Sequence, residues 1–493
     1  MAKRTAIIDI GSNSARMVVF EKTSHLAFHM IKEVKSQVRI GEGAYENGGV
    51  LQEVPLQRAY DALGSFKNII KSLKCQKTLC VATSALRDAP NAPSFINRVK
   101  KELHINIKII DGKKEAYYGG IAAINHLKPF DKAATIDIGG GSTELSFIQN
   151  NKIIQTISLN VGTVRLKELF LDKHAKTDKI AKFVEEIVQA LPDDFKTEKL
   201  IVIGGTTRYL SKLIMAKINY PLKTVHGFEY QLSDYLELIR DIKTSPTIQL
   251  KDFGIKKERI DTIREGLYIF DAVTAKLGTK HVITSGAGVR EGVYLSDLLR
   301  NQHHIFNPTF RLSLRSLIDR FEIQDIQNNS AVKCSSDLFD ALAYIHQIDS
   351  QYKKELEIAA KLYNIGIKLN FYQKNLHSFY FILNNLNYGF THQEKILVAI
   401  LIKYHMKKLP SAEEISRYQD LLPHIDTVNW LSFILSLTNC LHEDLINATF
   451  EFEYKNHTLY INSSKKLNLA KESIKKLAKP ASFAIVLNES RFF

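Results

Sequence analysis

The sequence predicts an α/β protein made of two related halves, followed by a mostly helical region and a small α/β appendage. The first observation is a repeated strand–turn–strand motif, in which residues 7–18 align with residues 135–146. The second is a series of turns that follow short apolar runs and combine glycine with Ser or Thr. The third is a change of pattern after residue 311, where apolar residues recur with helical spacing. Because the two copies of the motif lie about 128 residues apart, they indicate a duplicated unit.

The second copy of the motif carries the strongest chemical signal. Residues 137–144 read Asp-Ile-Gly-Gly-Gly-Ser-Thr-Glu between two apolar runs. Glycines let a backbone approach an anion and direct its N–H groups towards it. The candidate phosphate ligands are Gly139, Gly140, Gly141, Ser142 and Thr143. Carboxylates repel an anion unless a cation lies between them, so Asp137 and Glu144 are candidate metal ligands. An ordinary glycine hairpin is the alternative.

The first copy differs from the second at one informative position. Asp9 aligns with Asp137, and Ser12, Asn13 and Ser14 form the turn, but Arg16 stands where the second copy has Glu144. If the two halves face each other, both hairpins close on one cleft. Arg16 then supplies positive charge from one side, and Glu144 supplies a metal ligand from the other. Chance similarity of two short turns is the alternative.

The first half is predicted to hold five strands and two long helices. Strands are expected at residues 5–10, 16–21, 27–40, 79–83 and 105–110, and helices at 52–73 and 113–127. Arg87 follows the fourth strand, where open α/β sheets bind ligands, although a salt-bridged surface arginine is the alternative. Glu115 lies in the first turn of the second helix. It is either an acid favoured by the helix dipole or a general base for an attacking water.

The second half repeats this arrangement. Strands are expected at residues 134–138, 145–148, 152–160, 200–203 and 281–284, with helices at about 177–190 and from 289 to 299. The turn at residues 204–208 precedes a helix, whose N-terminus suits an anion, so Thr206 and Arg208 are weaker phosphate candidates. A polar stretch ending at Pro308 is a plausible linker. The predicted domains are residues 1–127, 128–305, 306–445 and 446–493.

Composition limits the possible classes of protein. The 493-residue chain has a net charge of +15, and residues 311–493 account for only +3, with 22 Lys and Arg against 19 Asp and Glu. The excess charge therefore lies with the repeated hairpins and suits a polyanionic ligand. The four cysteines have neither metal-ligand spacing nor a disulfide framework. No signal peptide or bilayer-spanning stretch is evident, so a cytoplasmic protein without a membrane or nucleic-acid partner is expected.

Taken together, these motifs resemble the exopolyphosphatase/guanosine pentaphosphate phosphohydrolase (Ppx/GppA) family of the actin-like ATPase-domain superfamily. The resemblance extends over about residues 5–300 and is carried by residues 8–16, 83–89, 111–116, 137–144, 203–208, 258–261 and 288–292. It implies two actin-like (ribonuclease H-like) domains with an active-site cleft between them. It also implies removal of a terminal phosphate from inorganic polyphosphate, or of the 5′ γ-phosphate from guanosine pentaphosphate.

The resemblance also implies a role for each candidate residue. Glu115 corresponds to the base that activates water, and Asp9, Asp137 and Glu144 to the acids that hold Mg²⁺, directly or through water. The residues that resemble the family's phosphate ligands are Ser12, Asn13, Ser14, Arg16, Arg87, Gly139, Gly140, Gly141, Ser142, Thr143, Thr206, Arg208 and Arg259. In-line attack on phosphorus needs a positioned water and charge neutralisation, which this set supplies.

The helical region resembles the family's HD-like domain but departs from its metal motif. Tyr363-Asn364 stand where a working HD phosphohydrolase reads His-Asp, and His377 and His405 follow in order. Loss of both ligands argues for a single active site, with these histidines structural or at the rim of a long-substrate path.

Two other functions compete with hydrolysis. One is a regulator that binds guanosine tetraphosphate or pentaphosphate with little turnover, and the other is an actin-like ATPase or kinase. Nothing obvious in the sequence reads adenine, and the combination of Glu115, Arg16 and Arg87 favours hydrolysis of a phosphate chain. The cleft motifs do not separate polyphosphate from guanosine pentaphosphate. A homodimer is expected from the resemblance alone.

Overall fold

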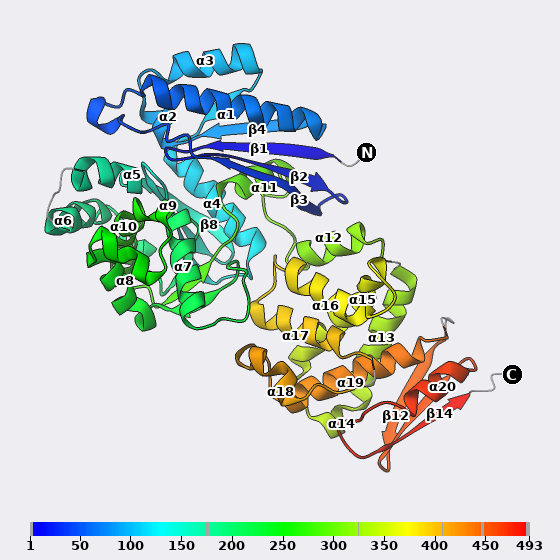
Figure 1. The fold of residues 1–493 in the computed structure, drawn as a ribbon. Coiled ribbons are helices and arrows are strands. Elements are labelled where there is room, and N and C mark those ends of the chain that lie inside the picture. Colours follow the sequence, from blue (N-terminus) through cyan, green and yellow to red (C-terminus); the bar gives the residue numbers. More distant parts are fainter. Residues whose placement is uncertain (1–2, 173–176, 324, 407, 445–447, 490–493) are drawn as a thin grey trace. The chain divides into compact units, whose positions relative to one another are not determined.

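The computed structural model describes residues 3–172, 177–323, 325–406, 408–444 and 448–489 (Figure 1). The chain divides into two compact units, Met1–Leu312 and Ser313–Phe493. The predicted boundary at residues 445 and 446 lies outside the described residues. The α/β class is confirmed, because strands and helices alternate through the first unit and a helical bundle with a small sheet forms the second.

A five-stranded sheet occupies the N-terminal part of the first unit. Its order is β3-β2-β1-β4-β5, with β1, β4 and β5 parallel and the β1-β2-β3 meander antiparallel. Helices α1 and α3 pack together beside the blue strands of this sheet (Figure 1). The strands are β1 (Arg4–Ile10), β2 (Ala15–Lys22), β3 (Phe28–Ser36), β4 (Lys77–Ala82) and β5 (Ile107–Ile109), and the helices are α1 (Glu53–Ser72), α2 (Ser84–Asp88) and α3 (Ala92–Leu103). The third strand ends at residue 36, earlier than predicted, because residues 39–41 turn onto the Ser12–Asn13 loop.

A second sheet repeats this topology. Its order is β10-β11-β9-β6-β7-β8, so the β6-β7-β8 meander corresponds to β1-β2-β3, and β9 and β11 continue the sheet in parallel as β4 and β5 do. The strands are β6 (Lys132–Ile138), β7 (Thr143–Gln149), β8 (Lys152–Leu159), β9 (Lys199–Val202), β10 (Glu229–Gln231) and β11 (His281–Thr284). The helices between them are α5 (Thr163–Leu166), α6 (Thr177–Val188), α7 (Gly205–Lys217), α8 (Leu236–Thr244), α9 (Lys257–Ile260) and α10 (Ile263–Leu277).

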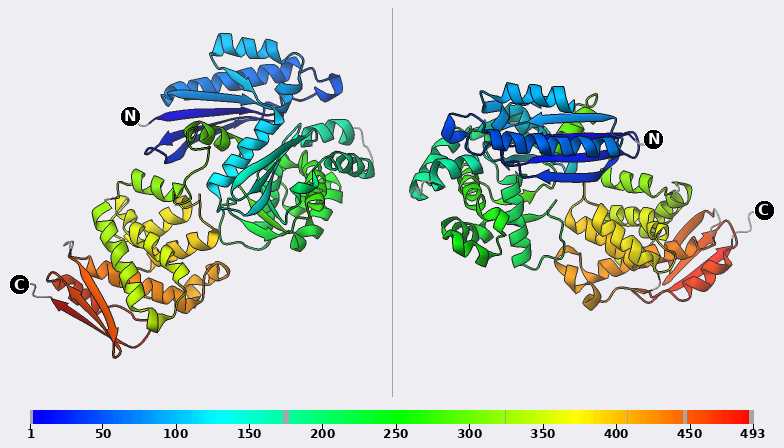
Figure 2. Two further views of the ribbon diagram at one scale, coloured as in Figure 1. Left: turned by 180° about the vertical axis from the view of Figure 1, so that it is seen from behind. Right: turned by 45° about the horizontal axis from the view of Figure 1, so that its top comes forward.

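Two helices tie the sheets together. Helix α4 (Gly112–His126) follows β5 of the first sheet but packs on β7 and β8 of the second, and it lies beside those teal strands in Figure 2. Helix α11 (Val289–Leu298) follows β11 of the second sheet but packs on β1 of the first. The two helices contact each other closely at Gly292, where an added Cβ would lie 1.9 Å from the carbonyl oxygen of Tyr118. This close approach fixes the relation between the two hairpins.

The second unit is a helical bundle with a three-stranded sheet. Its most buried helices are α17 and α19, whose central residues are almost all apolar and inaccessible. The helices are α12 (Leu312–Arg320), α13 (Asp325–Ala341), α14 (Ala343–His346), α15 (Lys353–Leu362), α16 (Lys374–Asn385), α17 (His392–Lys403), α18 (Ala412–Ile415), α19 (Ile425–Leu441) and α20 (Asn468–Ile474). The sheet has the order β12 (Phe450–Lys455), β13 (Thr458–Ser463) and β14 (Ala484–Glu489).

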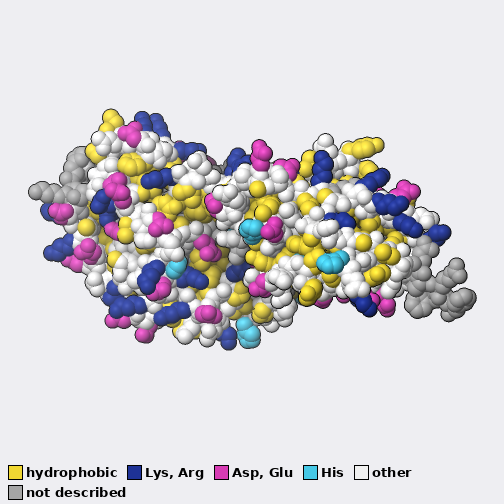
Figure 3. Space-filling view, turned by 90° about the horizontal axis from the view of Figure 1, so that it is seen from below, with side chains coloured by type: hydrophobic (Ala, Val, Ile, Leu, Met, Phe, Trp, Pro, Cys, Tyr) yellow, Lys and Arg dark blue, Asp and Glu magenta, His cyan; other side chains and the backbone are white. Residues whose placement is uncertain are grey.

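The surface drawn in Figure 3 is mixed in charge. Lys and Arg side chains lie among Asp and Glu across this face rather than in one broad patch. Several Lys and Arg side chains instead line one cavity of the first unit, described below. No helix in the described part of the chain is both long and apolar enough to cross a bilayer.

Candidate active site

The two predicted hairpins are structurally equivalent. Asp9 is the cross-strand partner of Arg16, and Asp137 is the cross-strand partner of Glu144. Each turn closes with the same backbone hydrogen bond, from Gly11 to Ser14 (3.1 Å) and from Gly139 to Ser142 (2.9 Å). The sequence alignment of the two motifs is therefore confirmed, including the exchange of arginine for glutamate at its end.

The hairpins meet at a cavity of about 170 Å³ in the first unit. The hydroxyl groups of Ser12, at the first turn, and Ser84 share a hydrogen bond, with 3.0 Å between the two oxygen atoms. Gly140 of the second turn lies against Ser12, since a Cβ added at this glycine would be 3.0 Å from the Cβ of Ser12. The predicted site residues that line the cavity are Asp9, Ser12, Asn13, Ser14, Arg16, Glu115, Asp137, Gly139, Gly140, Ser142, Thr206, Arg208 and Arg259.

Four predicted residues lie outside this lining. Thr143 is fully buried and donates a hydrogen bond to the Val161 carbonyl oxygen at 2.7 Å, so its hydroxyl supports the hairpin. Gly141 belongs to the turn but does not reach the cavity surface. Glu144 and Arg87 do not line the cavity themselves, but both contact Ser142, which does. Arg87 points towards Ser142, with 3.5 Å between its Nη2 and the serine Oγ.

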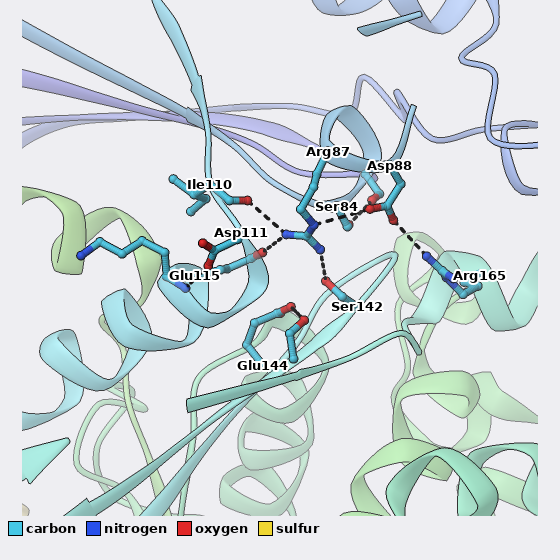
Figure 4. A network of polar contacts seen from close by, with 12 residues as sticks. Ser84, Arg87, Asp88, Ile110, Asp111, Glu115, Ser142, Glu144 and Arg165 are labelled. Carbon is cyan, nitrogen blue, oxygen red and sulfur yellow. Dashed lines mark hydrogen bonds and ion pairs between the residues drawn. The ribbon is translucent and has the colours of Figure 1, made fainter. Parts of the chain in front are cut away.

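Glu115 and Arg87 form the centre of the polar network in Figure 4. Their side chains approach to 3.2 Å, between Oε2 and Nη1, and Arg87 also donates to the carbonyl oxygen of Ile110 at 3.3 Å. Asp88 holds Arg165 at 3.2 Å on the far side. Glu115 is 8% exposed at the N-terminal turn of α4, which Asp111 caps by accepting from the N–H of Lys114. The base candidate is thus oriented by an arginine and anchored on a capped helix.

The carboxylates of the site share a raised affinity for protons. Burial, with the charges of Glu144 and Asp9, raises the pKa of Glu115 well above its usual value, and Arg87 opposes this only in part. Burial likewise raises the pKa of Asp9 to about 6 and that of Glu144 to about 7. A raised pKa makes the ionised carboxylate a stronger base, which suits proton abstraction from water.

Mg²⁺ fits these acids only together with other ligands. No three His, Cys, Asp or Glu side chains in the described ranges converge closely enough to hold a metal by themselves. Mg²⁺ usually takes one or two carboxylates, several waters and substrate phosphates. Asp9 and Asp137 are partly open to the cavity, whereas Glu144 is buried and accepts from Ser158 at 2.8 Å. Asp9 and Asp137 are therefore the candidate direct ligands, and Glu144 is placed to act through water.

The cavity also contains residues that sequence reasoning did not select. Lys35 reaches it because β3 places this residue opposite Arg16, a register that the sequence does not reveal. Arg290 lines it from the start of α11, and the glycine-flanked motif at residues 288–292 was the available signal. The other cavity-lining residues that were not among the predicted site residues are Gly11, Thr83, Ser84, Ile138, Thr163, Ile203, Gly204, Gly205, Thr262, Gly288 and Val289.

Arg208 lines the cavity and also makes contacts that the sequence does not predict. Its Nε donates to the carbonyl oxygen of Ser285 at 2.6 Å, and its Nη2 donates to that of Ala287 at 2.9 Å. These bonds hold the loop before α11. Arg259 has a freer guanidinium, which lies 5.6 Å from the ring centre of Tyr209 and borders Gly205.

In the second unit, the residues compared above with an HD motif are packed and hydrogen-bonded to one another or to their neighbours. Tyr363 is buried, with its ring centre 5.1 Å from that of His405. Lys374 donates to Asn364 at 3.0 Å. His405 is fully buried and contacts the Ile402 carbonyl oxygen through Nδ1, and burial lowers the pKa of His405 to about 4. A lysine ammonium beside these groups opposes metal binding there.

Comparison with known proteins places these features in one family. A model of the Ppx/GppA phosphatase family matches residues 18–301, and a model of that family's domain III matches residues 311–479. A guanosine-5′-triphosphate,3′-diphosphate pyrophosphatase of Photobacterium profundum is 26% identical over 423 residues, covering 83% of this chain and 82% of the relative.

Solved structures agree with the family match. The crystal structure of the Aquifex aeolicus Ppx/GppA family member is 28% identical and has a TM-score of 0.52, covering 62% of this chain and all of that one. An exopolyphosphatase from Cytophaga hutchinsonii shares the fold, with 23% identity, a TM-score of 0.55, and coverage of 60% of this chain and 98% of that one.

Proposed function

Since the chain belongs to the Ppx/GppA phosphatase family, we propose that it hydrolyses the terminal phosphoanhydride of inorganic polyphosphate, of guanosine pentaphosphate, or of both. The observation that carries this proposal is the position of Glu115, buried at a cavity that two glycine–hydroxyl turns and several cations line. Glu115 orients a water molecule and takes its proton, and the turns hold the terminal phosphate. Bound Mg²⁺ would add charge neutralisation on the phosphate oxygens.

Three arginines bind the transferred phosphate or orient the base. Arg16 and Arg259 neutralise the oxygens of the transferred phosphate, because guanidinium groups bind phosphate through paired N–H donors. Arg87 keeps Glu115 facing Ser142 and limits the rise in the pKa of the base. Water is the nucleophile, so no phosphorylated enzyme forms.

A second cavity favours a nucleotide substrate. It measures about 300 Å³, shares Ser12, Asn13 and Thr262 with the first, and is lined by more acids than bases. The acids are Glu42, Glu46, Glu168, Asp172, Glu258 and Asp261, against Arg39 and Lys167. Carboxylates repel a polyphosphate chain but accept hydrogen bonds from the N1–H and amino group of guanine. We infer that the base of guanosine pentaphosphate lies there.

The substrate comparison tests the proposal. We expect Mg²⁺-dependent phosphate release from guanosine pentaphosphate with a higher kcat/KM than from long-chain polyphosphate, and little release from ATP. Glu258→Gln should raise KM for guanosine pentaphosphate about three- to tenfold, because glutamine keeps one acceptor oxygen but loses the charge that strengthens the hydrogen bond, without raising KM for polyphosphate. Glu237→Gln, on the exposed surface of α8, is the control. If neither guanosine pentaphosphate nor polyphosphate released phosphate, the hydrolase proposal would be refuted. A higher kcat/KM for polyphosphate would refute the proposed guanine-binding cavity.

A pH profile tests the role of Glu115. Because the base must be deprotonated, kcat/KM should fall about tenfold per pH unit below its pKa, with a midpoint well above the 4.5 of an ordinary glutamate. Arg87→Gln should move that midpoint further up, since the charge of Arg87 lowers this pKa. Arg165→Gln, which removes an arginine paired with Asp88 rather than with Glu115, is the matched control. A midpoint that stays in place in the Arg87 variant would contradict the pairing.

A further inference from the structure

Arg290 is held at the cavity by a rigid frame. It is the second residue of α11, is 7% exposed, and lines the cavity together with Arg16 and Arg259. The loop before it is fixed by the two hydrogen bonds from Arg208, and the N–H of Gly288 donates to Glu291 at 2.7 Å. A guanidinium presented in this way needs little reorganisation to bind an anion.

The carboxylate of Glu33 is paired with this guanidinium. Glu33 accepts from Nη1 of Arg290 at 2.7 Å, and it comes from β3 of the first sheet. It lies two residues before Lys35 and therefore on the same face of the strand, where Lys35, Arg16 and Asp9 stand in register across three strands. The Glu33 side chain is 49% exposed and that of Arg290 is 9% exposed. The acid is thus the solvent-facing partner of a buried cation.

The cavity is cationic, and Glu33 offsets part of this positive charge. Five cationic side chains line the cavity: Arg16, Lys35, Arg208, Arg259 and Arg290. Hydrogen bonding from Arg290 and the nearby arginine charges lower the pKa of Glu33 despite its partial burial, so this acid is ionised at neutral pH. A carboxylate and a phosphate present similar oxygen pairs to a guanidinium.

We propose that Arg290 is a phosphate-binding residue of the site and that Glu33 takes the place of a substrate phosphate on it until the substrate arrives. Entry of a phosphate chain displaces the Glu33 carboxylate into solvent, and its departure lets Glu33 return. Glu33 therefore lowers the affinity of the site for anions and assists release of the shortened product. This inference rests on the proposed function only in taking the ligand to be a phosphate chain.

Binding of methylenediphosphonate tests the proposal without any turnover, because its P–C–P bridge is not hydrolysed. Titration calorimetry of the full chain should show a Kd three- to tenfold lower for Glu33→Gln and at least tenfold higher for Arg290→Gln. The double variant should match Arg290→Gln, since Glu33 acts only through Arg290. Glu21→Gln removes the same charge from the neighbouring strand, where Glu21 pairs with Arg4, and should stay within about twofold of the wild type, because this residue does not line the cavity.

Two results would overturn the proposal. Weaker binding by Glu33→Gln would show that Glu33 orients Arg290 rather than competing for it. An unchanged Kd in Arg290→Gln and in the better-tolerated Arg290→Lys would show that the pair only ties β3 to α11. Phosphate release is measured separately, so a protein that shows the expected Kd pattern but no turnover would refute the proposed function and leave this inference intact.

Discussion

Glu115→Gln should abolish most phosphate release while leaving ligand binding intact. General base catalysis by a positioned side chain typically contributes about 10²–10⁴-fold, and a glutamine cannot take the proton. The amide keeps the shape of the side chain and its acceptor for Arg87, so the cavity should keep its geometry. We expect kcat for guanosine pentaphosphate to fall by at least about a hundredfold, with a Kd equal to or below that of the wild type.

The thermal stability of this variant gives a second readout. Burial makes an ionised Glu115 unfavourable in the folded state, so its raised pKa means that folding loses stability as the pH rises from 4.5 through the folded-state value. Replacing it with a neutral amide should therefore leave Tm unchanged or higher at pH 8. Glu53→Gln, the same change in the first turn of α1 on the surface, is the control. A full rate in Glu115→Gln would remove this residue from the mechanism.

The parts of the fold that follow from local pattern were predicted well. The hairpins at Asp9 and Asp137 were recognised because each is encoded within ten or so residues, and their equivalence followed from comparing two short stretches. The strand order and the swapped packing of α4 and α11 depend on contacts between distant segments. No periodicity within either segment specifies those contacts.

The difference between local and long-range contacts also explains which site residues could be predicted. Residues within the repeated turns could be placed at a cleft because a hairpin fixes its own geometry, whereas Lys35 and Arg290 enter the cavity through strand register and helix packing. Arg208 lines the cavity as its position after a glycine turn suggests, but its hydrogen bonds to two carbonyl oxygens of the adjacent loop are not evident from the sequence. Thr143 likewise satisfies a buried carbonyl, which sequence alone does not show.

Gly292→Ala should destabilise the first unit and reduce catalysis together. An alanine Cβ would lie 1.9 Å from the oxygen and 2.5 Å from the carbon of the Tyr118 carbonyl group. Because the obstacle is the backbone of α4, no side-chain rotation relieves it, and the two helices must separate. Overpacking of this kind costs typically about 1–3 kcal/mol and occasionally more, so we expect the free energy of unfolding to fall by about 3 kcal/mol.

Catalysis should suffer because the two helices carry opposite sides of the site. Glu115 projects from α4 and Arg290 from α11, so separating them widens the cavity between base and phosphate ligands, and phosphate release should fall at least about tenfold even below the melting temperature. Gly64→Ala is the matched control. Gly64 lies in the interior of α1, where alanine is favoured over glycine by up to about 1 kcal/mol, and the added Cβ would lie 4.0 Å from Leu103, an ordinary contact distance. Equal stability and activity in the two variants would mean that the contact between α4 and α11 does not position the site.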